Sequence, residues 1–205
     1  MTVRRPEGLR GTAAARDTTS RSTVSNAPGA ELGLELYQLT RKGDYLKWAK
    51  RMYHWVRVCL REGTGLYADN INLAGYVDKS IWIYNQGTML GAEVLLYQVT
   101  GEASYVQRAQ EAARNAITYF TAAQLEHQPP FFVAIFADNL MRLNAVAPDP
   151  TYRNYLQEYG DRAWSTYREA ESGLFNFHDV TPTRLLQQAA MTQLYSYLAW
   201  DATWY

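Results

Sequence analysis

Leu36-Tyr37-Gln38-Leu39-Thr40 recurs 60 residues later as Leu96-Tyr97-Gln98-Val99-Thr100. Tyr45 then matches Tyr105 at the same offset. Each copy ends an apolar stretch and is followed by a short turn and a second, amphipathic stretch. A repeat at this spacing indicates helical hairpins that bury their faces against neighbouring hairpins, so the repeat predicts a stacked, all-helical architecture.

An aromatic and amide-rich stretch precedes the second copy. The segment Ile81-Trp82-Ile83-Tyr84-Asn85-Gln86-Gly87 is expected to form a loop that opens an apolar helix. Aromatic faces stack on pyranose rings, and amides pair with hydroxyl groups, so this layout indicates sugar recognition. One unit earlier, Ser25-Asn26-Ala27-Pro28 opens a helix in the same way, which makes Asn26 the counterpart of the later amides.

The rest of the chain continues the same alternation. Apolar residues at helical spacing predict about seven helices, joined in turn by short turns and longer loops. A loop with a short hairpin is expected over residues 66–82, Asp149-Pro150 starts a later helix, and Pro182 opens the last one. Short turns produce antiparallel helix pairs, and consecutive pairs in a ring produce an α/α toroid. The predicted fold class is therefore all-α, with helical hairpins arranged as in an α/α toroid.

The first residues differ from this pattern. Residues 1–22 are rich in Arg, Thr and Ala and poor in large apolar side chains, which predicts a disordered leader before a domain over residues 23–205. A mitochondrial transit segment is the alternative, since such segments are rich in Arg and poor in acidic residues. The start has no apolar core of a signal peptide, so the chain as written is expected in the cytoplasm.

Composition excludes several classes of partner. The formal net charge is +0, which leaves no global electrostatic attraction to nucleic acid or to an anionic membrane. No apolar run approaches the ~20 residues that span a bilayer. Cys59 is the single cysteine, and His54, His127 and His178 lack metal-ligand spacing. We expect no metal and no cofactor.

Several segments together carry a family resemblance. They are Ser25-Asn26-Ala27-Pro28, Gly65-Leu66-Tyr67-Ala68-Asp69, Tyr84-Asn85-Gln86-Gly87-Thr88, Leu96-Tyr97-Gln98-Val99-Thr100-Gly101, Leu185-Leu186-Gln187-Gln188-Ala189-Ala190 and Leu198-Ala199-Trp200. In order and spacing, roughly residues 22–205 resemble family 76 glycoside hydrolases. The resemblance implies an (α/α)6 barrel of twelve helices, of which this chain would supply about seven. It also implies an activity of the endo-α-1,6-mannanase type.

The resemblance further implies a retaining mechanism that uses two adjacent aspartates. Retention needs one carboxylate as nucleophile and one as acid/base, about 5–5.5 Å apart. In the family this pair lies upstream of the matched region, and no two consecutive aspartates occur in this chain. The chain therefore resembles the C-terminal part of the barrel, and we assign no catalytic residue.

Five residues are candidates for substrate binding: Asn26, Asp69, Tyr84, Asn85 and Gln86. Asp69 follows an expected outer helix at the place where the groove of the family would lie, and its alternative role is that of a turn residue. Asn85 has the alternative of capping its helix. The candidates are predicted to converge on one concave face, with Asn26 nearby.

The predicted function is that of a mannanase-type glycoside hydrolase that is truncated and inactive alone, with mannan-type polysaccharide or oligosaccharide as its partner. The alternative is a non-catalytic carbohydrate-binding or helical interaction protein. An incomplete ring would leave apolar side chains exposed at its two open edges. We expect Leu32, Leu34, Leu36 and Tyr37 at one edge and Leu194, Tyr195 and Leu198 at the other, and hence self-association.

Overall fold

The structure, a computed structural model, describes residues 19–177 and 185–199. Within these residues it contains eight helices and three short strands. The helices are α1 (Thr23–Thr40), α2 (Gly43–Cys59), α3 (Ile83–Thr100), α4 (Ala103–Tyr119), α5 (Ala122–Glu126), α6 (Pro130–Val146), α7 (Pro150–Tyr167) and α8 (Leu185–Ala199). The strands are β1 (Ser20–Ser22), β2 (Ala68–Asn72) and β3 (Val77–Ile81).

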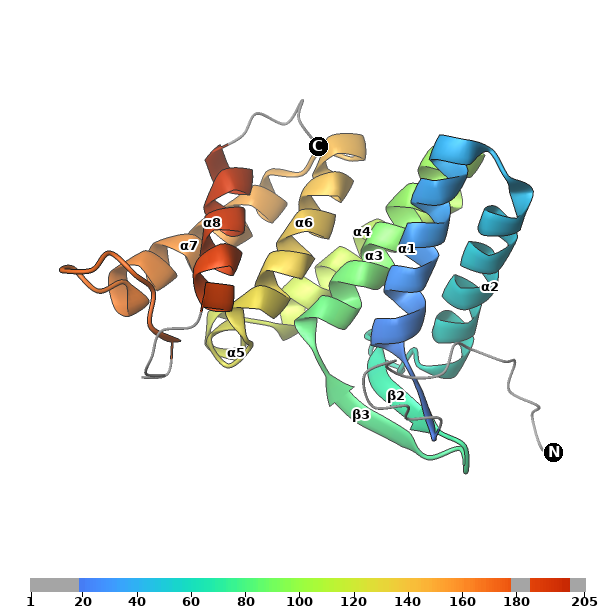
Figure 1. Cartoon of the computed structure of the whole chain (residues 1–205), viewed down its shortest axis with the longest axis horizontal. Coiled ribbons are helices and arrows are strands. Elements are labelled where there is room, and N and C mark those ends of the chain that lie inside the picture. Colours follow the sequence, from blue (N-terminus) through green and yellow to red (C-terminus); the bar gives the residue numbers. More distant parts are fainter. Residues whose placement is uncertain (1–18, 178–184, 200–205) are drawn as a thin grey trace.

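The helices form two layers of antiparallel hairpins. Helix α1 packs on α3, α3 on α6 and α6 on α8, and these four run in the same direction, with their N-terminal ends at the bottom of Figure 1. Helices α2, α4 and α7 return on the other side and pack against this inner row. The prediction of stacked helical hairpins is confirmed. None of the described helices is both long and apolar enough to cross a membrane.

The 60-residue repeat reappears in atomic detail at the C-terminal ends of α1 and α3. The Thr40 hydroxyl donates to the Leu36 carbonyl at 2.6 Å, and the Thr100 hydroxyl donates to the Leu96 carbonyl at 2.7 Å. Both hydroxyls also accept a hydrogen bond from the backbone N–H two residues later. The repeated sequence therefore encodes the same helix end and the same tight turn twice.

A small antiparallel sheet lies at the N-terminal ends of α1 and α3, in the order β1-β2-β3. The hairpin β2–β3 confirms the one expected over residues 66–82. Strand β1 corrects the predicted leader, because its last three residues pair with β2. Their polar sequence carries no strand signal, and the strand is held by backbone pairing and by the Thr23 hydroxyl, which donates to the Ala68 carbonyl at 2.6 Å. Residues 1–18 of the expected leader lie outside the described residues.

One predicted helix start differs from the structure, and a second agrees with it. Helix α3 begins at Ile83, so Tyr84, Asn85 and Gln86 form its first turn instead of the preceding loop. Its N-cap residue is Trp82, which excludes Asn85 as the cap. Helix α7 begins after Asp149 as expected, and the Asp149 carboxylate accepts from the Thr151 N–H. Pro182, expected to open the last helix, lies outside the described residues.

The core consists of two apolar clusters, one around α1, α2 and α3 and the other around α3, α4, α6, α7 and α8. Leu34 is 0% exposed in the first cluster, and Leu194 is 1% exposed in the second. Both were expected at open edges, and the structure corrects this because each packs within the apolar cluster formed with neighbouring helices. Leu32 remains 57% exposed, as expected.

Candidate functional site

Three of the predicted residues meet at the end of the molecule that carries the sheet. Asp69 lies on β2, whereas Tyr84 and Asn85 lie on the first turn of α3. The Tyr84 hydroxyl donates to Asp69 Oδ1 at 3.3 Å, and Asn85 Nδ2 donates to the same oxygen at 3.2 Å. Asn70 Nδ2 donates to Asp69 Oδ2 at 3.0 Å. The carboxylate of Asp69 is therefore held in place by three side chains.

Two further properties of this site concern the proton of the Tyr84 hydroxyl and the amide oxygen of Asn85. Burial and the negative charge of Asp69 raise the pKa of Tyr84, so its hydroxyl keeps its proton at neutral pH. Asn85 is 0% exposed, and its Oδ1 has no hydrogen-bond partner among the described residues. A buried acceptor without a partner is unusual in a folded protein, and this one lies beside the fixed carboxylate.

Gln86 has a structural role in this site. Its Oε1 accepts from the Tyr67 N–H at 2.8 Å, and its Nε2 donates to the carbonyls of Tyr67 and Trp82, both at 3.0 Å. With 2% exposure and its whole amide occupied, Gln86 clamps the segment that leads to Asp69. The expected contact of Gln86 with substrate stays a prediction. Sequence alone misses this role because the clamp joins residues 19 positions apart.

Asn26 lies in the first turn of α1, at the same end of the inner row as Tyr84. It is 0% exposed, and its Nδ2 donates to the carbonyl of Ser22 at 2.9 Å. This bond joins α1 to β1, the strand that pairs with β2. Asn26 therefore supports the sheet on which Asp69 lies.

Sequence reasoning missed an aromatic cluster next to Asp69. The ring of Phe132, at the start of α6, lies 4.2 Å from that of Tyr84, 5.7 Å from that of Trp82 and 4.8 Å from that of Phe131. The signal was present, because Phe131 and Phe132 open the third inner helix just as Tyr84 opens the second. Aromatic faces beside a carboxylate and amides are a usual composition for binding sugar rings.

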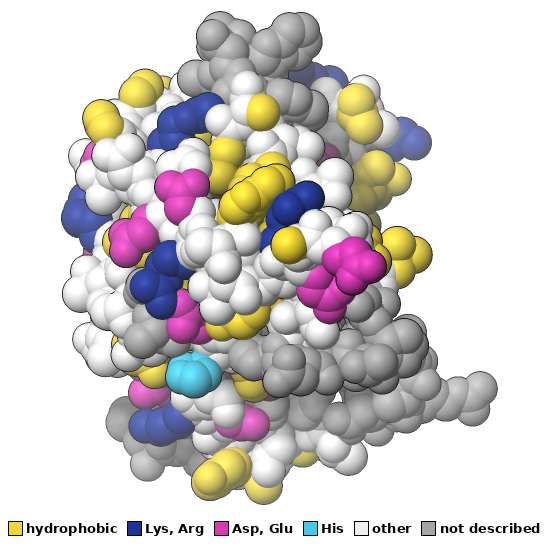
Figure 2. Space-filling view, turned by 90° about the vertical axis from the view of Figure 1, so that its left-hand side faces the viewer, with side chains coloured by type: hydrophobic (Ala, Val, Ile, Leu, Met, Phe, Trp, Pro, Cys, Tyr) yellow, Lys and Arg dark blue, Asp and Glu magenta, His cyan; other side chains and the backbone are white. Residues whose placement is uncertain are grey.

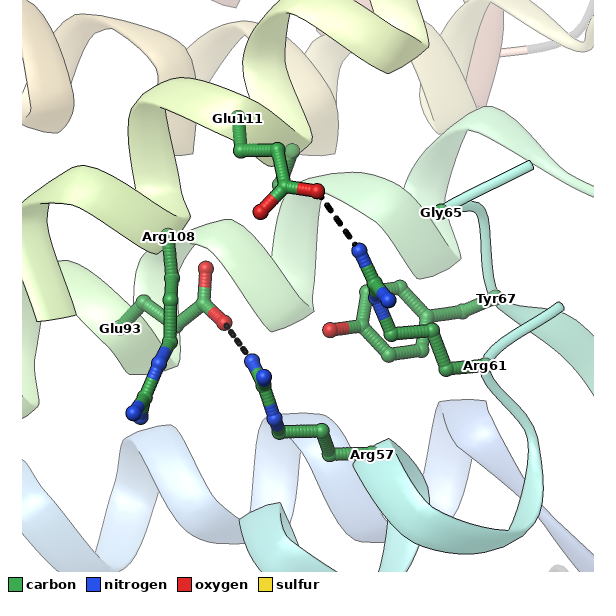
Figure 3. Close-up of a pocket in the computed structure, with 8 residues that line it drawn as sticks. Arg57, Arg61, Gly65, Tyr67, Glu93, Arg108 and Glu111 are labelled. Carbon is green, nitrogen blue, oxygen red and sulfur yellow. Dashed lines mark hydrogen bonds and ion pairs between the residues drawn. The ribbon is translucent and has the colours of Figure 1, made fainter. Parts of the chain in front are cut away.

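A cluster of charged side chains lies between α2, α3 and α4, next to the loop that carries Gly65 and Tyr67. Figure 3 shows these side chains. Glu93 of α3 accepts from the Tyr53 hydroxyl at 2.9 Å and lies 3.8 Å from Arg57 Nη1. Arg108 and Tyr67 line the same small cavity. Burial raises the pKa of Glu93 to about 7, against the opposing effects of Tyr53 and Arg57. Glu93 thus joins the two helix layers, and it faces the outer layer.

A second hollow follows the concave side of the inner row, between α1, α3, α6 and α8. It measures about 330 Å³ and carries Glu31, Glu35, Asp138 and Arg142 together with apolar side chains. Arg142 pairs with Glu35 at 3.0 Å and with Asp138 at 3.2 Å. These charges join α1 to α6 across α3. Among the described residues, no group of three or more His, Cys, Asp or Glu side chains has the arrangement of a metal site.

Residues 8–202 match the sequence profile described as Glycosyl hydrolase family 76. The match covers nearly the whole chain.

The chain belongs to glycosyl hydrolase family 76.

Several known proteins agree with this assignment. A mannan endo-1,6-alpha-mannosidase of Candida glabrata is 31% identical over 117 residues, which cover 51% of this chain and 26% of that protein. The corresponding protein of Saccharomyces cerevisiae is 30% identical over 106 residues, or 49% of this chain and 24% of that protein. The matched regions therefore span about a quarter of these curated relatives.

Solved family 76 structures show the same fold. A mannosidase of Bacteroides thetaiotaomicron aligns with a TM-score of 0.80 and 25% identity, over 94% of this chain and 58% of that one. An α-1,6-mannanase of Salegentibacter, solved as an inactive variant with two consecutive aspartates changed to asparagine and in complex with α-1,6-mannotriose, aligns with a TM-score of 0.79 and 25% identity. The alignment covers 62% of the Salegentibacter chain and 94% of this chain. Because family 76 structures are α/α toroids, the predicted fold class is confirmed.

Proposed function

We propose that this chain forms the mannan-binding part of a family 76 mannanase domain and binds α-1,6-linked mannose units at the N-terminal ends of α1, α3 and α6. The observation that carries the proposal is the convergence of Tyr84 and Asn85 on the carboxylate of Asp69, beside the ring of Phe132. The family assignment and the relatives that act on or bind α-1,6-linked mannose support it.

The side chains at this site match a neutral, ring-shaped ligand. A pyranose offers an apolar face, which an aromatic ring covers, and hydroxyl groups that both donate and accept. Asp69 is an acceptor fixed by its neighbours, and the Tyr84 hydroxyl remains a donor across neutral pH. Such an arrangement is preorganised, which lowers the entropy cost of binding.

We further propose that the chain binds mannan but does not cleave it alone. The sequence contains no consecutive aspartates, whereas the Salegentibacter mannanase is described as inactive once two consecutive aspartates are replaced. A retaining glycosidase needs two carboxylates about 5–5.5 Å apart, and a single carboxylate such as Asp69 cannot both attack and protonate.

Calorimetric titration of the full chain with α-1,6-mannotriose tests binding. We expect Asp69→Asn and Tyr84→Phe each to weaken binding by about tenfold, because each removes part of one hydrogen-bonded group worth roughly 1–2 kcal/mol. Asp161→Asn, a matched change at an exposed position of α7, should leave affinity unchanged. Equal affinity of the wild type and the Asp69→Asn variant would contradict the proposed site.

Incubation of the same protein with α-1,6-mannan tests the absence of cleavage. We expect no release of mannose oligomers. Reproducible release that Asp69→Asn abolishes would show that Asp69 is catalytic and that a second carboxylate serves beside it.

A further inference from the structure

A second cleft lies on the outer side of the molecule, where the α2–β2 loop meets the C-terminal end of α4. It measures about 390 Å³, within the usual range of small-molecule sites. Its polar lining residues are Thr64, Asn115, Thr118, Tyr119, Thr121 and Gln124, and Leu66 completes the lining. Thr64 belongs to the loop. The other five polar residues belong to α4, to α5 or to the residues between these helices.

The chemistry of this lining is uniform. None of its seven residues is charged, although 20% of the residues of the chain are Asp, Glu, Lys or Arg. Four of the lining residues carry hydroxyl groups and two carry amides, so almost every contact that the cleft offers can both donate and accept. An ionic ligand would find no counter-charge among these residues, whereas a neutral, polyhydroxylated ligand would find hydroxyl and amide groups to bond with.

The aromatic member of the cleft is held firmly. Tyr119 is 46% exposed and packs edge-on against Phe120, with ring centroids 4.9 Å apart. Phe120 is 1% exposed, and its carbonyl accepts from the Tyr155 hydroxyl of α7 at 2.7 Å. A half-exposed ring on a fixed backbone loses little entropy when a ligand covers it, as is usual for tyrosines in binding surfaces.

The opposite wall is also fixed by close packing. Gly65 has a φ of +85°, and a Cβ at this position would overlap the amide of Asn115. The loop therefore lies directly on α4, and the Asn115 amide is held at the base of the cleft. On the other side, the Thr121 hydroxyl donates to Gln124 Oε1. The cleft is thus preformed in the free protein.

We propose that this outer cleft is a second carbohydrate-binding site, which takes a neutral oligosaccharide with a sugar ring on Tyr119 and its hydroxyl groups on Asn115, Gln124 and the threonines. Leu66 lies in the wall of the cleft, three residues before Asp69. The loop that carries Leu66 leads directly into β2, which carries Asp69, and a polymeric ligand would be held at two points of the same molecule. The choice of a mannan-type ligand rests on the proposed function, whereas the preference for an uncharged sugar rests on the lining alone.

Amide NMR titration of the full chain with α-1,6-mannotriose tests this proposal, because it reports the two sites separately. We expect shifts around residues 115–124 as well as around residues 67–85. Tyr119→Ala should weaken the first response by about tenfold and leave the second unchanged. Tyr119→Phe is the matched control, since it keeps the stacking ring and should retain most of the affinity. Asp69→Asn should weaken the response around residues 67–85 and leave the response around residues 115–124 unchanged.

Each outcome separates the two proposals. Shifts confined to residues 67–85 would overturn the second site and support the proposed function. Shifts confined to residues 115–124 and insensitive to Asp69→Asn would support the cleft and overturn the proposed site at Asp69. If maltotriose shifts residues 115–124 and α-1,6-mannotriose does not, the cleft binds neutral sugars but its mannan-type ligand is wrong. If neither sugar changes the amide signals of residues 115–124, the cleft proposal is wrong.

Discussion

At the scale of single residues, Glu31 is an unusual carboxylic acid. Glu31 Oε1 and Asn139 Oδ1 both lie so close to Gly91 that a Cβ at this position would overlap them. Asn139 Nδ2 is occupied by the Ile135 carbonyl at 3.2 Å, and Oδ1 has no donor among the described residues. Both side chains therefore lie against Gly91, which has no Cβ to displace them.

The surroundings of Glu31 change its pKa. Burial raises the pKa of Glu31 to about 8; Asp138 and Glu35 add to this shift, whereas Arg142 and a hydrogen bond with Asn139 oppose it. Because the pKa in the folded state lies above the ordinary value of 4.5, the folded protein binds this proton more tightly than the unfolded chain does. The resulting stability is complete below about pH 4.5 and is lost as the pH rises to about 8.

The prediction is that Glu31→Gln removes this loss. At pH 8 the variant should be more stable than the wild type, by on the order of a few kcal/mol, whereas at pH 5 the two should be similar. Urea melts at both pH values measure the difference. The exposed Glu158→Gln should show no such pH-dependent gain. A gain of equal size at pH 5 and pH 8 would mean that Glu31 does not titrate as described.

At the scale of elements, two connections from an outer to an inner helix, α2–α3 and α7–α8, are each clamped by a glutamine. Gln86 holds both backbone groups of Tyr67, and Gln188 of α8 holds both backbone groups of Phe175, at 2.9 and 2.6 Å. Each clamped residue also forms an isolated bridge with the end of the preceding outer helix. These two glutamines therefore align each clamped loop with the first turn of the inner helix that follows it.

The glutamine clamps differ in burial, and this difference predicts their energies. Gln86→Leu leaves the Tyr67 N–H and carbonyl buried without partners, and we expect it to lower the free energy of unfolding by about 2–4 kcal/mol. Gln188 is half-buried, so water can replace its bonds and Gln188→Leu should cost only about 1 kcal/mol. Gln38→Leu, at the exposed Gln38–Gln98 contact, is the control with a small effect. Urea denaturation measures all three, and equal losses for Gln86 and Gln188 would contradict this ranking.

At the scale of the whole molecule, the inner row is an open arc. Figure 2, which views the molecule from the side of α7 and α8, shows acidic and basic side chains interspersed with hydrophobic ones. Exposed large hydrophobic side chains on these two helices include Trp164, Leu185 and Leu186. On the concave side, Leu32 and Ile135 are 57% and 39% exposed in the hollow between α1 and α6. Apolar surface of this kind gains about 25 cal/mol per Å² when it is covered.

We predict that the purified chain self-associates through this concave side. Size-exclusion chromatography at rising protein concentration should show a shift to larger species, because each copy can cover the exposed side chains of another. Leu32→Glu should shift the equilibrium back toward monomer, since it places a charge beside Glu35 and Asp138. Leu39→Glu, at a side chain that is 82% exposed outside the hollow, is the matched control. A monomer at every concentration, with a sharp thermal transition, would contradict this prediction.

The sequence by itself determined the helical hairpins, their order and the end of the molecule at which Asp69 and Tyr84 lie. These features depend on local spacing, such as the repeated Leu-Tyr-Gln segment, and each hairpin largely encodes its own turn. The tertiary structure alone decided that Gln86 clamps a loop, that Phe132 stacks beside Tyr84 and that Glu31 meets Asn139. Each of these contacts joins separate segments of the chain, and the spacing of residues along a helix carries no information about which distant side chain the fold brings to it.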